Sequence, residues 1–176
     1  MSLYLFEIVP ATEQREAAQS VISAIAEAAS SVSASVLESQ VTSGHGRVFS
    51  VVEFDGDPAA LGSAVSQGLE ATEITGPDEV RLVGAQIEDI RGARGSADYL
   101  VEWDIPAEID METYLTRKKA NSPKYAQVPE VSFLRTYVRE DTVKCLCFYD
   151  APDEETVVRA REVVSTPIDR LHALEG

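Results

Sequence analysis

The feature that most constrains this chain is an internal repeat with an offset of 95 to 97 residues. The opening run Tyr4-Leu5-Phe6-Glu7 recurs as Tyr99-Leu100-Val101-Glu102. Further strand-like runs recur in the same order, at residues 36–41 and 133–138 and at residues 48–52 and 145–149. A segment of helical periodicity follows in each half, and a Pro-containing break follows that segment. Matched elements in one order predict a duplicated structural unit.

Each copy contains the order strand, helix, strand, strand, helix, strand. In the second copy the helices are expected over residues 111–119 and from Asp153 onward, and the last strand within residues 168–174. This order is that of a ferredoxin-like unit. Each sheet would carry helices on one face and leave an apolar face that needs cover. The sequence therefore predicts an α+β fold of two tandem ferredoxin-like (βαββαβ) units, packed as an internal pseudo-dimer in an α/β sandwich or barrel.

The boundary between the copies is expected in the run Arg91-Gly92-Ala93-Arg94-Gly95-Ser96, which has small and charged residues and no apolar anchor. The first repeat would occupy residues 1–90, a linker residues 91–97 and the second repeat residues 98–176. Within the first repeat, Gly76-Pro77 is expected to break the chain before a fourth strand over residues 80–85.

The charge balance restricts the classes of partner. The chain has 30 Asp and Glu against 15 Lys and Arg, a formal net charge of −15. Such a surface repels nucleic acid and anionic membranes and attracts cations. The apolar runs are far too short to span a bilayer, and no basic leader precedes the first strand. We expect a cytoplasmic protein that binds a small molecule or a metal ion. It could also form a homo-oligomer through its sheet faces or edges.

Glu102 is the first candidate functional residue, and Glu7 matches it in the first repeat. A carboxylate inside a sheet is tolerated only if it is paired or ligated. A salt bridge to Arg135 or Lys144 on the neighbouring strands is one interpretation. A metal ligand or a general base is the other.

A second group of candidates lies on the paired strands of the second repeat. Arg135 and Tyr137 share one face of their strand, and Cys145, Cys147 and Tyr149 share one face of the next. If the two faces coincide, they form a patch of donors, thiols and phenols for an anionic or aromatic small molecule. The alternative is an amphipathic sheet face with two buried cysteines, since residues two apart on one strand make a strained disulfide.

Several short motifs of the second repeat are similar to one known family. They are Tyr99-Leu100-Val101-Glu102, Tyr137-Val138, Cys147-Phe148-Tyr149-Asp150-Ala151-Pro152 and Pro167-Ile168-Asp169-Arg170. They resemble the nickel-binding-protein-like family, domain of unknown function 4242, over roughly residues 98 to 174. The resemblance implies a ferredoxin-like fold that pairs into a dimer, and nickel as a bound metal. The first half would be a diverged copy.

Nickel prefers imidazole and, in octahedral sites, oxygen ligands. The chain has only two histidines, His45 in a glycine-rich turn and His172 in the last expected strand. Together with Glu102 they are the candidate metal ligands, although the two histidines are far apart in sequence.

Three functions remain open at this point. The first is a small-ligand or divalent-metal binding protein, with nickel implied by the resemblance. The second is a cofactor-independent small-molecule enzyme of the dimeric α+β barrel type, which rests on analogy of fold. The third is a structural or protein-interaction module that uses exposed sheet edges.

Overall fold

The structure is a computed structural model that describes residues 1–92 and 97–175 of the chain. It contains two compact units. Of the described residues, the first unit comprises residues 1–80, residues 87–92 and Glu175, and the second comprises residues 81–86 and 97–174. A short helix, α3 (Ile87–Gly92), occupies the start of the segment expected as a linker. Residues 93–96 of that expected linker lie outside the described residues.

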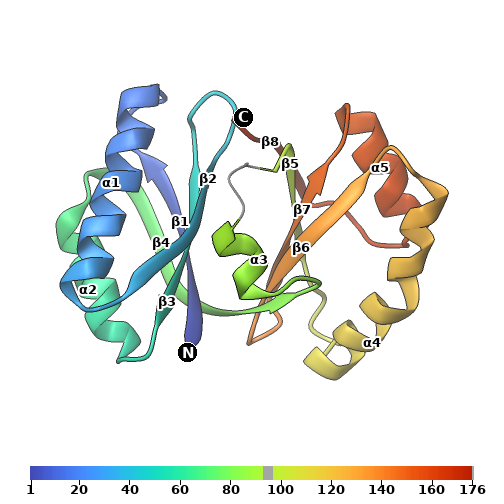
Figure 1. Ribbon diagram of the computed structural model, residues 1–176, viewed down its shortest axis with the longest axis horizontal. Helices are drawn as coiled ribbons and strands as arrows, with labels where there is room; N and C mark the ends of the chain where they lie inside the picture. The colour runs from blue at the N-terminus through green and yellow to red at the C-terminus, as the bar shows by residue number, and fades with distance from the viewer. Residues whose placement is uncertain (93–96, 176) are drawn as a thin grey trace. The chain divides into compact units, whose positions relative to one another are not determined.

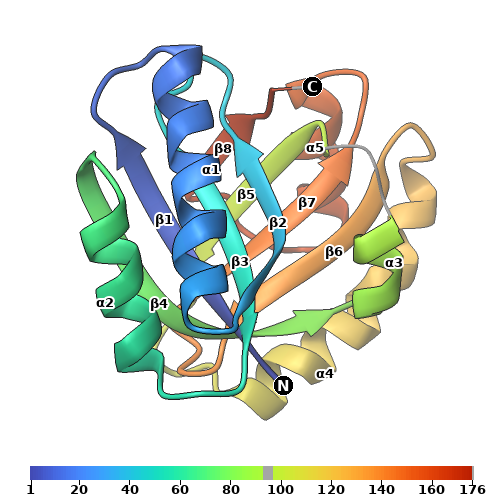
Figure 2. The same cartoon turned by 60° about the vertical axis from the view of Figure 1, so that its left-hand side comes forward.

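The first unit has the order βαββαβ. Its elements are β1 (Ser2–Pro10), α1 (Arg15–Ser31), β2 (Ser35–Val41), β3 (Val48–Phe54), α2 (Pro58–Gly68) and β4 (Ala71–Val83). The strands are ordered β2-β3-β1-β4 across the sheet, and each pair that involves β1 or β3 is antiparallel. Helices α1 and α2 cover one face of this sheet (Figure 2).

The second unit repeats this order. Its elements are β5 (Tyr99–Asp104), α4 (Met111–Asn121), the 3₁₀ helix η1 (Ser122–Gln127), β6 (Ser132–Arg139), β7 (Lys144–Asp150), α5 (Glu154–Val163) and β8 (Arg170–Ala173). The strand order β6-β7-β5-β8 corresponds position by position to that of the first unit. Helices α4 and α5 cover one face of this sheet (Figure 1). The predicted α+β class with two βαββαβ copies is confirmed.

Aspartate caps fix the start of three helices. The side chains of Asp57, Asp110 and Asp153 accept hydrogen bonds from backbone amides of Ala59, Thr113 and Thr156, at 3.0, 2.8 and 2.8 Å. Each bond satisfies an amide that has no partner within its own helix. The caps therefore determine which residues of each helix face the sheet.

The predicted break at Gly76-Pro77 is wrong, because β4 continues through it. A register shift in the pairing of β1 with β4, between Leu5 and Glu7, absorbs the Gly-Pro pair as a bulge. A Cβ atom at Gly76 would lie 2.3 Å from the carbonyl oxygen of Leu5, and the φ angle of Gly76 is +113°. Only glycine fits this position, so the Gly-Pro pair marks an irregular strand.

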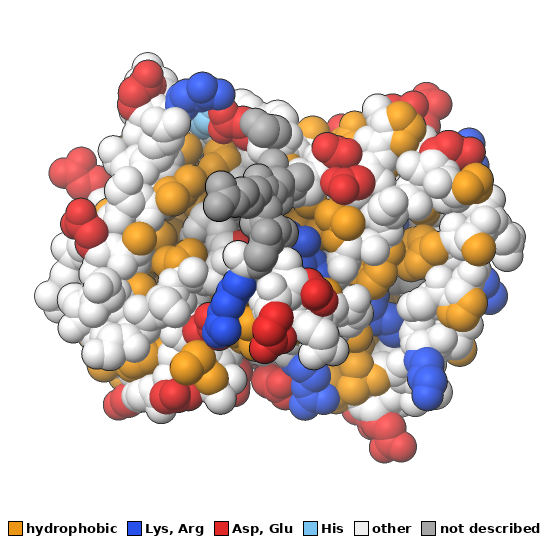
Figure 3. Space-filling view, in the orientation of Figure 1, with side chains coloured by type: hydrophobic (Ala, Val, Ile, Leu, Met, Phe, Trp, Pro, Cys, Tyr) orange, Lys and Arg blue, Asp and Glu red, His pale blue; other side chains and the backbone are white. Residues whose placement is uncertain are grey.

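On the face shown in Figure 3, the acidic side chains are scattered and do not gather in one patch. This distribution is that of a solvated acidic surface. Within residues 1–92 and 97–175, no helix is both long enough and apolar enough to cross a membrane.

Candidate functional site

The site residues predicted on β6 and those predicted on β7 lie on opposite faces of the second sheet. A register shift between Phe133 and Arg135 offsets β6 against β7, so that Tyr137 pairs with Leu146. Paired residues share a face, and Leu146 points away from its neighbour Cys147. Arg135 and Tyr137 are therefore on the face opposite the cysteines and Tyr149. The single patch predicted from a shared face therefore does not form. The prediction failed because residue spacing in the sequence does not reveal the bulge.

Glu102 is the centre of an ion-pair network. Its carboxylate lies 2.7 Å from Nζ of Lys144, 3.0 Å from Nε of Arg170 and 2.6 Å from Nε2 of His172, and the residue is 1% exposed. Burial opposes ionisation, but the hydrogen bonds with His172 and Lys144 and the charge of Arg170 hold the pKa of Glu102 at about 2. The predicted salt bridge with Lys144 is present. Arg135 lies with its guanidinium 4.9 Å from the ring centroid of Phe148.

The structure brings together two of the three candidate metal ligands, His172 and Glu102, but not His45. His45 lies in the first unit, with its Nε2 3.0 Å from the carboxylate of Glu175. His172 contacts Glu102, but Lys144 and Arg170 occupy the same carboxylate, and their charges would repel a metal cation. Over the described part of the chain, no group of three or more His, Cys, Asp or Glu residues could hold a metal ion. These residues do not fit a nickel centre.

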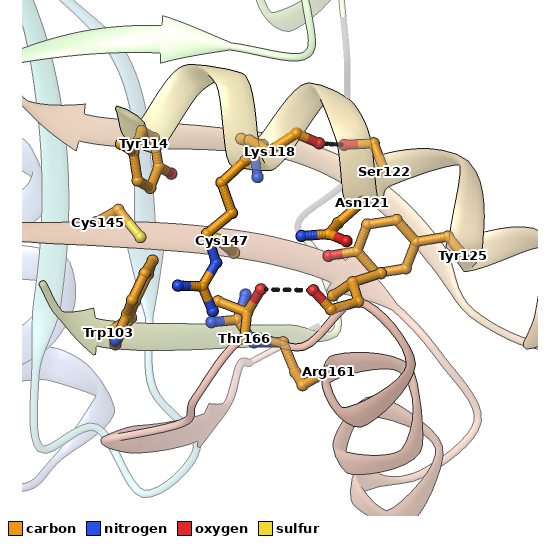
Figure 4. A pocket seen from close by; sticks show the side chains of 12 residues that line it. Trp103, Tyr114, Lys118, Asn121, Ser122, Tyr125, Cys145, Cys147, Arg161 and Thr166 are labelled. Carbon is orange, nitrogen blue, oxygen red and sulfur yellow. Dashed lines mark hydrogen bonds between the residues drawn. The ribbon is translucent and has the colours of Figure 1, made fainter. Parts of the chain in front are cut away.

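A pocket lies on the other face of the second sheet, beneath α4, η1 and α5. It provides about 20 Å³ for the centre of a water-sized sphere, inside an empty volume of about 370 Å³ that includes open solvent. Its lining residues come from β5, β7 and the helices (Figure 4). They are Trp103, Tyr114, Arg117, Lys118, Asn121, Ser122, Tyr125, Cys145, Cys147, Arg161, Val164 and Thr166.

Arg161 is the most unusual of these residues. It is only 2% exposed, and among the described residues no carboxylate forms an ion pair with it. Its Nη1 donates a hydrogen bond to the hydroxyl of Tyr149 (3.0 Å) and its Nη2 to the carbonyl of Pro167 (2.6 Å). Its Nε is buried and has no hydrogen-bond partner within the described chain. A buried guanidinium with an unused donor is costly unless something else compensates it.

Two further cations line the same pocket. The guanidinium carbon of Arg117 lies 5.3 Å from the ring centroid of Trp103, and an amino group of Arg117 donates to the carbonyl of Ser165 (2.5 Å). The ammonium of Lys118 lies 4.4 Å from the ring centroid of Phe133. Neither forms an ion pair with any carboxylate of the described residues. None of the twelve lining residues is acidic, so the pocket is electropositive in a strongly acidic protein.

The phenols and thiols of the pocket respond to this environment. Burial raises the pKa of Tyr125 to about 12, and its hydroxyl shares a 2.6 Å hydrogen bond with that of Tyr149. A hydrogen bond from Cys145 lowers the pKa of Cys147, and Lys118, Arg161 and Thr136 act in the same direction. The same bond and burial raise the pKa of Cys145. The pKa of Tyr149 is raised as well, so both phenols stay protonated, and Cys147 is the more acidic of the two thiols.

Sequence reasoning found Cys147 and Tyr149 in this region but missed the helix residues. The spacing from the expected helix start could have found them: counted from the cap Asp110, the four α4 side chains that line the pocket stand at positions 4, 7, 8 and 11. This spacing defines one face of a helix. On that face α4 carries polar and charged residues, which are Tyr114, Arg117, Lys118 and Asn121.

The second unit can now be compared with known proteins. Residues 99–174 match the family described as nickel responsive protein SCO4226-like. The match covers the second repeat and confirms the resemblance drawn from its motifs. No curated protein matches the chain at a significant level.

Solved structures show the fold across the whole chain. A protein provisionally assigned as a chlorite dismutase aligns with a TM-score of 0.53 at 11% identity, over 100% of this chain and 96% of that one. A provisionally assigned monooxygenase from Lactobacillus acidophilus aligns with a TM-score of 0.51 at 12% identity, over 99% and 92% of the two chains. One from Fusobacterium nucleatum gives 0.50 at 12% identity, over 99% and 91%. At these identities the likeness is one of fold.

Proposed function

We propose that the second unit binds a small oxyanion, either free or as the carboxylate or phosphate head group of a small molecule, in the pocket beneath α4 and α5. The observation that carries this proposal is the buried Nε of Arg161, which has no protein partner within the described chain. A planar guanidinium is suited to carboxylates and phosphates, and charge-assisted hydrogen bonds are the strong ones.

The surroundings of Arg161 support the same ligand class. Arg117 and Lys118 contribute two further charges without carboxylate partners in the described chain. The amide of Asn121 and the hydroxyls of Ser122 and Thr166 also line the pocket. A bound oxyanion would supply the negative charge that this cluster lacks and would meet a few convergent polar groups, as in other small-molecule sites.

Nickel is the metal suggested by the description of the matching family. The described residues offer no cluster for it, and a pocket lined by three basic residues would repel a free cation. Nickel therefore serves as a discriminating control in the test of anion binding.

Trp103 allows a direct measurement, because it is the only tryptophan of the chain and lines the pocket. We would titrate the protein with phosphate, sulfate, nitrate and acetate at constant chloride and follow Trp103 fluorescence, with nickel chloride as the cation control. Saturable binding of at least one oxyanion is expected. Weak responses equal for all anions, or a response to nickel alone, would refute the proposal.

Arg161→Met is the decisive variant and Arg159→Met its matched control. Arg159 lies in the same helix but is exposed, where it pairs with Glu130 at 2.5 Å. Loss of one charge-assisted contact predicts affinity weaker by about tenfold or more for Arg161→Met. Arg159→Met should bind as the unchanged protein does. Equal affinity in both variants would remove Arg161 from the site and refute the proposed binding mode.

A further inference from the structure

Cys147 has surroundings that the proposed anion site does not explain. It is 1% exposed in the chain as a whole, yet it lines the pocket together with Arg161 and Lys118 (Figure 4). The hydroxyl of Thr136 donates a hydrogen bond to its Sγ at 3.2 Å. Donors and cations thus surround this sulfur.

We propose that Cys147 is a site of reversible oxidation, at which the cysteine thiolate reacts with hydrogen peroxide that enters the pocket. The proposal goes beyond anion binding: it uses the same cations but requires no external anion.

The electrostatics of the pocket support a thiolate at this position. The hydrogen bond from Cys145 lowers the pKa of Cys147, and the charges of Lys118 and Arg161 and the hydroxyl of Thr136 lower it further, against the effect of burial. Thiolates held by basic residues are the reactive form of cysteine, whereas buried cysteines in apolar surroundings are inert. Cys145 stays a thiol, because its pKa is raised by the same bond and by burial.

The pocket has room for a small oxidant. About 20 Å³ is available to the centre of a water-sized sphere, and roughly 10–15 Å³ of such volume is needed for one water molecule. Hydrogen peroxide is only slightly larger than water, so this space admits it.

The reaction is a two-electron oxidation of sulfur. The thiolate attacks one peroxide oxygen, the S–O bond forms as the O–O bond breaks, and hydroxide leaves and takes a proton from solvent to become water. The product is a sulfenic acid. Cys145 is two residues away on the same strand, where a disulfide would be strained, so the sulfenic acid should persist until a low-molecular-weight thiol condenses with it and releases water.

The test is mass spectrometry after the folded protein has been treated with equimolar hydrogen peroxide and then unfolded in urea with dimedone, which traps sulfenic acid. One oxygen atom, or one dimedone adduct, is expected on Cys147 and not on Cys145. Its formation should be at least about tenfold faster than in the urea-unfolded chain, where both thiols have ordinary pKa values. Modification of Cys145, or equal rates in the folded and unfolded chain, would overturn the proposal.

Variants separate this chemistry from anion binding. Cys147→Ser should abolish the adduct, and Cys145→Ser should retain it at Cys147. Thr136→Val and Arg161→Met should slow it, while Arg159→Met should leave the rate unchanged. Oxidation is read by mass and anion binding by Trp103 fluorescence, so either proposal can fail alone.

Discussion

The helix-facing interiors of the two units have the same geometry and opposite chemistry. Counted from the cap Gln14, positions 4, 7, 8 and 11 of α1 are Ala18, Val21, Ile22 and Ile25. They belong to or pack against one apolar cluster in the first unit. The same positions of α4, counted from Asp110, are Tyr114, Arg117, Lys118 and Asn121, and all line the pocket.

The second helix of each unit shows the same contrast. Leu61 and Val65 are the buried residues of α2, four apart, and both are 0% exposed. Val157 and Arg161 stand at the same two positions of α5, counted from its cap Asp153, and both are buried. An arginine thus stands where the first unit has a valine, and its guanidinium extends into the pocket.

The strands beneath the helices follow the same pattern. Ile8 pairs with Val48 in the first unit, and Trp103 pairs with Cys145 at the matching position of the second. One polar contact occurs in both units. The hydroxyls of Ser39 and Ser50 are 2.7 Å apart, and the hydroxyl of Thr136 donates to the thiol of Cys147.

These differences distinguish the interior of the second unit from that of the first. The first unit fills its interior with aliphatic and aromatic side chains and gains stability from burial. The second unit keeps an apolar core that includes Val101, Val138 and Val157, and this core borders a pocket that also carries basic side chains. Two copies in one chain allow the first to stabilise the fold while the second accommodates the cost of desolvated charges.

The largest expected effect is that of Val65→Arg. It places a guanidinium in the apolar interior of the first unit, where we expect a loss of about 3 kcal/mol or more in the free energy of unfolding. Urea unfolding followed by circular dichroism measures it, and Val65→Met is the matched apolar control. If Val65→Arg were as mild as Val65→Met, the interiors of the two units would not differ as described.

The next largest effect concerns the matched carboxylates. Glu102→Gln should lower the free energy of unfolding by about 2 kcal/mol at neutral pH, because it breaks a buried ion-pair network. Glu7→Gln should cost less, since the carboxylate of Glu7 lies 3.8 Å from the guanidinium of Arg47. Urea unfolding of both variants measures the difference. Equal losses would contradict the inference that the Glu102 network is the stronger.

The pH dependence follows from the same network. The pKa of Glu102 is about 2 in the folded chain against an ordinary 4.5, so the unfolded chain binds more protons between these values. The contribution of Glu102 should be complete above about pH 4.5 and should be lost as the pH falls toward about 2. Acid titration of the unchanged protein and Glu102→Gln should therefore give curves that converge at low pH. Parallel curves would contradict the lowered pKa.

Arg161→Met should have a smaller effect on stability, about 1 kcal/mol or less in either direction. The variant loses the hydrogen bonds to Tyr149 and to the carbonyl of Pro167, but it also removes a desolvated charge, and these contributions oppose each other. Urea unfolding followed by Trp103 fluorescence reports on the second unit. A loss as large as that of Val65→Arg would make Arg161 a structural residue instead of a ligand-binding one.

The smallest expected effects concern the polar contact that occurs in both units. Ser39→Ala should cost about 0.5 kcal/mol, the ordinary contribution of one hydrogen bond. Thr136→Val should cost about 1 kcal/mol if Cys147 is the thiolate that we propose, because the hydroxyl of Thr136 then donates to a charged sulfur. Thermal unfolding of both variants at pH 8 makes the comparison. A smaller cost for Thr136→Val than for Ser39→Ala would argue against the thiolate at Cys147.

The duplication, the order of the elements and the resemblance of the second half to a known family could all be predicted from the sequence. These properties depend on local patterns: the repeated opening strand, the helix caps at Asp110 and Asp153, and the motif around Cys147. The sequence also identified Glu102 as a carboxylate that needs a partner, because a charge within a strand must be compensated wherever the strand lies.

Only the tertiary structure decided which side chains meet. A one-residue bulge in β6 placed Arg135 and Tyr137 on the face opposite Cys147, because the side-chain alternation of a strand reverses with each inserted residue. The pocket joins Lys118 from α4, Cys147 from β7 and Arg161 from α5. These residues are distant in sequence, and their convergence depends on how the helices pack on the sheet.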